Sequence, residues 1–137
     1  MSRDIVHDLV KNALIKDGWR ITHDPFPIEF GIRKVFADLG AEKLIAAEKG
    51  EQKIVVEIKS FIGISLVTEL ERALGQFVLY KSWLSRSKPE RILYIALGHD
   101  IFDELFRDIS GQVLIEDYYL FSCPRRPGCK SRCINGG

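Results

Sequence analysis

The sequence lacks the features that mark membrane and secreted proteins. No apolar run approaches the ~20 residues that a membrane-spanning helix needs. The first eight residues of the opening segment MSRDIVHDLV include two acids, Asp4 and Asp8, which is not the pattern of a secretory signal peptide. We therefore expect a cytoplasmic protein with no membrane segment.

Cysteine is missing from the chain until Cys123, so the predicted fold needs no disulfide. The last fifteen residues, CPRRPGCKSRCINGG, hold all three cysteines, show no apolar period and are rich in Pro, Gly, Arg and Lys. This composition is typical of a disordered segment. The spacing C-x5-C-x3-C matches no usual zinc pattern and has no fourth ligand nearby. A basic arm that contacts phosphate is another alternative. We expect one domain over residues 1–121 and a disordered tail over 122–137.

An excess of charge of one sign is also missing. Lys and Arg number 20 against 19 Asp and Glu, which gives a net charge of +1. No global basic field would attract nucleic acid, so DNA binding would need a local patch. Hydrophobic residues make up 46% of the 137 residues, enough for one globular domain with a real core.

Apolar periodicity predicts the order α-β-β-β-α-β-α-β. Two helical stripes predict helices over Asp4–Lys16 and Leu66–Ser85. The other predicted elements are an extended segment at Trp19–Phe30, a strand at Arg33–Glu48 with Gly40 as a candidate kink, a turn at Lys49–Gln52, strands at Lys53–Phe61 and Arg91–Leu97, a short helix at His99–Asp108 and a last strand at Gln112–Phe121.

The strand segment VVEIKSF, which begins at Val55, carries two charges within a run of β-forming residues. Because side chains alternate along a strand, Val55, Glu57 and Lys59 share one face, and the other face packs. An exposed salt bridge between Glu57 and Lys59 is the simpler interpretation of this pattern.

The preceding hairpin would add acids to the same face. If residues 49–52 form a four-residue loop, Glu42 lies opposite Lys59 and Leu44 lies opposite Glu57. The face then collects four acids: Asp38, Glu42, Glu48 and Glu57. Such acids repel one another unless a cation joins them, and Mg²⁺ or Mn²⁺ prefers carboxylate oxygens. We therefore predict a metal site suited to phosphodiester hydrolysis, with Lys59 stabilising charge on the phosphate.

Asp38, followed after 18 residues by E-I-K at Glu57, resembles the PD-(D/E)xK nuclease signature, with alanine where proline is often found. Hairpin counting places Glu42 nearer to Glu57 than Asp38 is. A β-bulge around Gly40 would bring Asp38 back. We favour Asp38 as the second metal carboxylate, with Glu42 as the alternative.

Two further features add to this resemblance. Gln76 and Tyr80 share one helix face at i and i+4. A Q-x-x-x-Y helix beside the E-x-K strand is similar to that of RecB-like nucleases, where it contacts the active site. An amphipathic helix that partly faces the core is the alternative. On the first helix, His7 is a candidate supporting ligand or contact, unless it belongs to a solvated polar face.

Three longer segments resemble the XisH family: HDLVKNALIKDGWRITHDPF, ADLGAEKLIAAEKGEQKIVVEIKSF and ELERALGQFVLYK. The resemblance covers residues 2–117 and implies a restriction-endonuclease-like α/β (α+β) fold. That fold has a mixed central sheet flanked by helices, in the core order αβββαβ. The resemblance also implies a factor that controls excision of the fdxN element during heterocyst development in cyanobacteria. The implied site is Asp38, Glu57 and Lys59, supported by Gln76.

The implied partners are DNA, a XisI-like protein and a site-specific recombinase. Two functions follow as hypotheses: a Mg²⁺- or Mn²⁺-dependent endonuclease, or a catalytically silent regulator that binds DNA or protein through the nuclease fold. We also expect a homodimer, because restriction-like folds often dimerise to cut both strands. A purely structural assembly subunit is a further alternative, with Phe61 and Ile62 as its interface.

Overall fold

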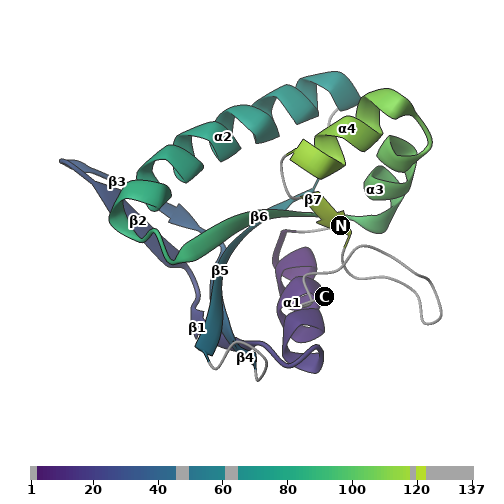
Figure 1. Ribbon diagram of the computed structural model, residues 1–137. Helices are drawn as coiled ribbons and strands as arrows, with labels where there is room; N and C mark the ends of the chain where they lie inside the picture. The colour runs from purple at the N-terminus through teal and green to yellow at the C-terminus, as the bar shows by residue number, and fades with distance from the viewer. Residues whose placement is uncertain (1–2, 46–49, 61–64, 118–119, 123–137) are drawn as a thin grey trace.

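The structure, a computed structural model, describes residues 3–45, 50–60, 65–117 and 120–122 (Figure 1). The cysteine-containing tail, Glu48, Phe61 and Ile62 lie outside this part of the chain. The elements are, in order, α1 (Arg3–Lys16), β1 (Arg20–His23), β2 (Phe26–Phe30), β3 (Arg33–Ala37), β4 (Leu39–Ile45), β5 (Gly50–Lys59), α2 (Leu66–Ser87), β6 (Arg91–Leu97), α3 (His99–Phe106), α4 (Ile109–Asp117) and β7 (Leu120–Ser122).

Seven strands form two sheets in the described part of the chain. The larger sheet has the order β1-β4-β5-β6-β7 and the smaller sheet pairs β2 with β3. β1, β4 and β5 pair antiparallel, whereas β5, β6 and β7 pair parallel. The helix α2 connects the parallel strands β5 and β6, since such strands need a crossover. The predicted mixed α/β fold with a central sheet flanked by helices is confirmed.

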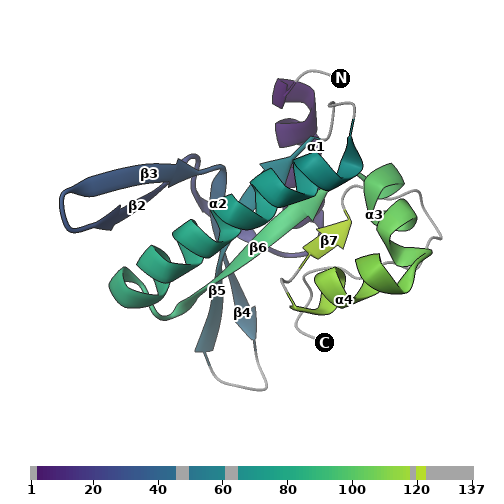
Figure 2. The same ribbon diagram turned by 90° about the horizontal axis from the view of Figure 1, so that it is seen from above.

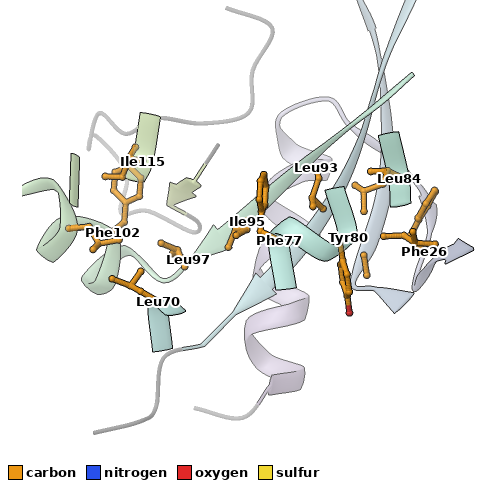
Figure 3. Close-up of a cluster of buried hydrophobic side chains, with 14 residues drawn as sticks. Phe26, Leu70, Phe77, Tyr80, Leu84, Leu93, Ile95, Leu97, Phe102 and Ile115 are labelled. Carbon is orange, nitrogen blue, oxygen red and sulfur yellow. The ribbon is translucent and has the colours of Figure 1, made fainter. Parts of the chain in front are cut away.

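Helices cover the two faces of the larger sheet with two apolar clusters. In Figure 1, α2 lies over one face and α1 lies under the other. Val10 and Leu14 of α1 pack against Ile54 and Val56 of β5. Figure 3 shows the cluster on the α2 face, where the labelled residues are Phe26, Leu70, Phe77, Tyr80, Leu84, Leu93, Ile95, Leu97, Phe102 and Ile115.

The β2–β3 hairpin extends from the body of the domain as a two-stranded arm (Figure 2). Phe26 and Ile28 anchor it, because both are buried in the cluster under α2. Toward its turn the arm is exposed, with Ile32 97% and Phe30 43% accessible to solvent. The Gly31 backbone adopts a positive φ of 60° at this turn, a conformation that glycine reaches without strain.

The helices at residues 4–16 and 66–85 and the strand at residues 91–97 are confirmed to within two residues at each end. The predicted strand at Gln112–Phe121 is wrong. Residues 109–117 form α4, and only Leu120–Ser122 is a strand. Val113 and Ile115 favoured a strand by propensity, but burial of Ile115 and Gly111 on one helix face overrides it. No helix in the described ranges is long and apolar enough to cross a bilayer.

Two predictions about the hairpin region are also wrong. Gly50, Glu51 and Gln52, assigned to a turn, are the first residues of β5. Arg33–Glu48 is not one kinked strand, because β3 and β4 belong to different sheets and the chain passes between them at Asp38 rather than at Gly40.

Candidate functional site

The register of the β4–β5 hairpin decides which acid lies beside Glu57. Leu39 pairs with Val56, so Asp38 stands one step before the first pair, next to Glu57. The predicted register was wrong: Glu42 lies opposite Lys53 rather than Lys59, because β5 starts earlier than expected. No β-bulge is required between β4 and β5, since their pairs run without a register shift.

Where the β4–β5 pairing ends, side-chain carboxylates accept hydrogen bonds from backbone amides. The Asp38 amide donates to Oε1 of Glu57 at 3.2 Å, and the Ile58 amide donates to Oδ2 of Asp38 at 2.7 Å. Both side chains are nearly inaccessible, with Asp38 7% and Glu57 6% exposed. The sequence places them here because β3 ends at Ala37, and the chain must turn at Asp38 to join the larger sheet.

Glu57 carries the strongest electrostatic signal of the site. Nζ of Lys59 lies 3.5 Å from Oε2 of Glu57, and both side chains are on the same face of β5. Burial raises the pKa of Glu57 from 4.5 to about 8, and the hydrogen bond with Asp38 and the charge of Asp38 add to this shift. The positive charge of Lys59 opposes it. Two buried carboxyl groups in contact thus need a proton or a cation between them.

The helix α2 ties the Q-x-x-x-Y residues to the strand that leads to Asp38. Nε2 of Gln76 donates to the Tyr80 hydroxyl at 2.8 Å, and this hydroxyl donates to the Phe36 carbonyl at 3.4 Å. The ring of Tyr80 is held in the apolar cluster (Figure 3). Tyr80 therefore fixes the backbone two residues before Asp38, and Gln76 orients the hydroxyl.

Glu57, Lys59, Gln76 and Tyr80 line an open cavity of about 660 Å³. Its walls come from β3, from the end of β5 and from α2, with the lining residues Val35, Phe36, Glu57, Ile58, Lys59, Ser60, Glu69, Arg72, Ala73, Gln76 and Tyr80. Phe36, Glu69 and Arg72 were not predicted from the sequence to belong to the site. Glu69, Arg72 and Gln76 follow helical spacing along α2, and this periodicity was the signal that could have found the two charged residues.

The XisH protein family matches residues 1–122 of the chain. The chain belongs to the XisH family. A crystal structure of a XisH family protein from Nostoc punctiforme has 37% sequence identity and a TM-score of 0.72, over 87% of this chain and 88% of that one. A fdxN element excision controlling factor protein from Anabaena variabilis has 36% identity and a TM-score of 0.73, over 88% of each chain. No curated protein matches the chain.

In this XisH-family chain, three predicted site residues are absent from the cavity lining: Asp38, Glu42 and His7. Asp38 still contacts Glu57, whereas Glu42 and His7 lie apart from the site. Glu42 accepts from Arg20 at 2.8 Å and from Arg91 at 3.1 Å, and its pair with Lys53 is three residue pairs along the β-ladder from Leu39–Val56, the pair next to Glu57. Nε2 of His7 lies 2.8 Å from Oδ1 of Asp24, on the helix that covers the opposite sheet face. The hairpin register thus favours Asp38 over Glu42 as the carboxylate beside Glu57.

The donors at the site fit a small hard cation. Asp38 and Glu57 bring two carboxyl groups together, and Mg²⁺ is held by one or two carboxylates while it keeps several waters. In the described part of the chain, no group of three or more His, Cys, Asp or Glu residues could hold a metal ion. A zinc or calcium site would demand more protein ligands than this pair offers.

Proposed function

We propose that this chain is a Mg²⁺- or Mn²⁺-dependent nuclease that acts in the excision of a DNA element. The observation that carries the proposal is the buried Asp38–Glu57 pair with Lys59 at 3.5 Å from Glu57, where Glu57 and Lys59 line an open cavity. Buried acids that repel each other are costly to hold together, and such strained groups concentrate at functional sites.

Each residue has a distinct role in this proposal. Asp38 and Glu57 would hold the cation, which supplies an activated water and neutralises charge on the phosphate. Lys59, with its side chain 26% exposed, places an ammonium group where charge develops on the phosphate oxygens. Tyr80 and Gln76 keep the strand before Asp38 in place, so they are positioning residues.

The wider role follows from the family. The Anabaena variabilis relative is described as a fdxN element excision controlling factor, and we extend this role to the chain on the strength of 36% identity over nearly its whole length. DNA, a XisI-like protein and a site-specific recombinase are the partners that we propose for it, and a homodimer would allow both strands to be cut.

The test is cleavage of labelled DNA in Mg²⁺ or Mn²⁺ by the wild type, Lys59→Met and Lys53→Met. Lys59→Met should lower the cleavage rate about 100-fold or more, the usual effect of losing one transition-state donor. Lys53→Met is the matched control, because Lys53 lies on the same strand but beside Glu42. Circular dichroism melts verify that both variants fold. Equal rates in Lys59→Met and the wild type would contradict the proposal.

A second candidate is the catalytically silent regulator that binds DNA or protein. One observation favours it: among the described residues no cluster of three or more His, Cys, Asp or Glu side chains could hold a metal ion, and Glu57 already has Lys59 as a counter-ion. A folded wild type that cleaves neither single-stranded nor duplex DNA in either metal would support this candidate.

A further inference from the structure

An exposed aromatic residue is part of the candidate site. Phe36 lines the cavity that contains Glu57 and Lys59, yet the residue is 54% exposed. Single exposed apolar residues are common on protein surfaces and need no special explanation. The position of Phe36 is what distinguishes it, because the residue is two places before Asp38 and forms one wall of the same cavity.

The backbone that carries this ring is fixed on several sides. The Tyr80 hydroxyl donates to the Phe36 carbonyl, and β3 pairs with β2 through Pro27. The neighbouring side chain of Val35 packs against the apolar core under α2. Phe36 is therefore an aromatic surface on a rigid strand, and a ligand that stacks on it would order little of the protein.

Cationic side chains lie around the same ring and cavity. Nζ of Lys34 is 5.3 Å from the centroid of the Phe36 ring. Lys59 stands on the β5 wall, and Arg72, whose side chain is 76% exposed, stands on the α2 wall. Each of these cations also pairs with a carboxylate, Lys34 with Glu29, Lys59 with Glu57 and Arg72 with Glu69. An exposed aromatic ring beside an ammonium group, next to a cavity that carries further cations, matches a ligand with planar bases and phosphates.

We infer that the substrate is a nucleic acid with at least one unpaired base, which stacks on Phe36 while Lys59 and Arg72 contact the phosphates. In an intact duplex the face of each base is covered by its neighbours, so only a single strand or an extruded base exposes it. The inference deepens the proposed nuclease function and rests on it, because Phe36 belongs to the same cavity.

The experiment separates bases from phosphates. Fluorescence anisotropy in EDTA measures binding to a 20-nucleotide single strand and to a base-free strand of equal length that keeps every phosphate. The wild type should prefer the strand with bases. Phe36→Ala should weaken binding to that strand about fivefold to 150-fold, the range for one stacked base, with little change for the base-free strand. Phe36→Trp should retain the preference.

Phe30→Ala is the matched control. Phe30 lies on the same hairpin and is 43% exposed, but it does not line the cavity, so this variant should bind as the wild type does. Arg72→Ala should weaken binding to both strands alike and reduce the salt slope by about 0.7, as expected for one lost phosphate contact on a single strand. Arg86→Ala, 14 residues along the same helix, should leave the slope unchanged.

Equal wild-type affinity for the two strands, or equal losses in Phe36→Ala and Phe30→Ala, would overturn the inference. A change of oligomeric state in both variants, seen by size-exclusion chromatography, would instead assign the hairpin to a protein contact. Binding is measured without metal, so its outcome is independent of cleavage. Base-dependent binding without cleavage would reject the nuclease function alone, whereas Lys59-dependent cleavage without a Phe36 effect would reject this substrate class alone.

Discussion

At the scale of single residues, Asp38 and Glu57 each do two things. Their carboxyl oxygens accept the amides of Asp38 and Ile58, which satisfies backbone groups at the end of the β4–β5 ladder. The same oxygens then lie together in a buried position, where the pKa of Glu57 rises to about 8. Removal of the Glu57 charge therefore affects both stability and any cation site.

The first prediction concerns pH. Because the pKa of Glu57 rises from 4.5 to about 8 on folding, the folded state keeps a proton between these values that the unfolded state releases. This contribution to stability is fully present below about pH 4.5 and is lost as the pH rises toward 8. In EDTA, Glu57→Gln should be more stable than the wild type at pH 8, by roughly 1–4 kcal/mol, and similar to it at pH 5.

Urea unfolding of both proteins at pH 5, 6, 7 and 8 checks this prediction. The readout is the difference in the free energy of unfolding between the two proteins at each pH. Partial burial and Arg91 lower the pKa of His23, which makes the stability of both proteins rise with pH, and the difference cancels this effect. Glu71→Gln, on an exposed position of α2, should follow the wild type at every pH. A constant difference between Glu57→Gln and the wild type would refute the assigned pKa.

At the scale of elements, α2 connects the core to the site. One face buries Leu70, Phe77 and Leu84, and the adjoining positions Arg72 and Gln76 line the cavity. Ser65 caps the helix, since its Oγ accepts the amide of Thr68. The helix is thus held along its length, which suits an element that must position Tyr80 against β3.

Two glycines in helices should respond to alanine in opposite ways. A Cβ on Gly75 of α2 would meet nothing within 4 Å, so Gly75→Ala should stabilise the protein by about 0.5–1 kcal/mol. A Cβ on Gly111 of α4 would clash with the backbone of Leu105, including its carbonyl oxygen, so Gly111→Ala must push α3 and α4 apart. We expect it to cost about 1–3 kcal/mol, as overpacking does.

Thermal denaturation of the two variants tests this pair, with each serving as the control for the other. Similar shifts of the same sign would show that helix propensity alone decides both, and that the close approach of α4 to α3 at Gly111 does not hold in solution.

At the scale of the whole molecule, the two faces of the larger sheet differ: one is closed by packing, and the other carries the candidate site. The α1 face is closed by a compact apolar cluster, while on the α2 face a cavity opens between β3, the end of β5 and α2. Midway along the β4–β5 ladder, the carboxylate of Glu42 is held by three cations, Arg20, Arg91 and Lys53. Glu42 is therefore engaged in ion pairs away from the cavity, whereas Asp38 and Glu57 contact each other beside it.

The last prediction couples metal, pH and global stability. A cation that binds Asp38 and Glu57 must displace the proton from Glu57, so Mn²⁺ should stabilise the protein more at pH 9 than at pH 6. At 100 times the dissociation constant, binding adds about 2.7 kcal/mol, which raises Tm by several degrees. Differential scanning fluorimetry measures the shift. It should vanish in Glu57→Gln and persist in Glu71→Gln, and an equal shift in both variants would place the metal elsewhere.

The sequence by itself determined the main elements and the chemistry. The apolar stripes of α1 and α2 and the β-branched run of β6 gave the right elements, because burial follows their period. The E-x-K pattern placed Glu57 and Lys59 on one face of β5, since side chains alternate along any strand. The resemblance to XisH proteins indicated Asp38, although local counting pointed to Glu42.

Only the tertiary structure decided the register and the cavity. A hairpin register depends on where pairing starts, and residues 50–52 pair as strand although their composition is that of a turn. The same applies to α4, where packing against α3 overrides strand propensity. Phe36 belongs to the site only because β3 lies against α2, where the Tyr80 hydroxyl donates to the Phe36 carbonyl. Such contacts between segments far apart in the chain leave no local pattern in the sequence.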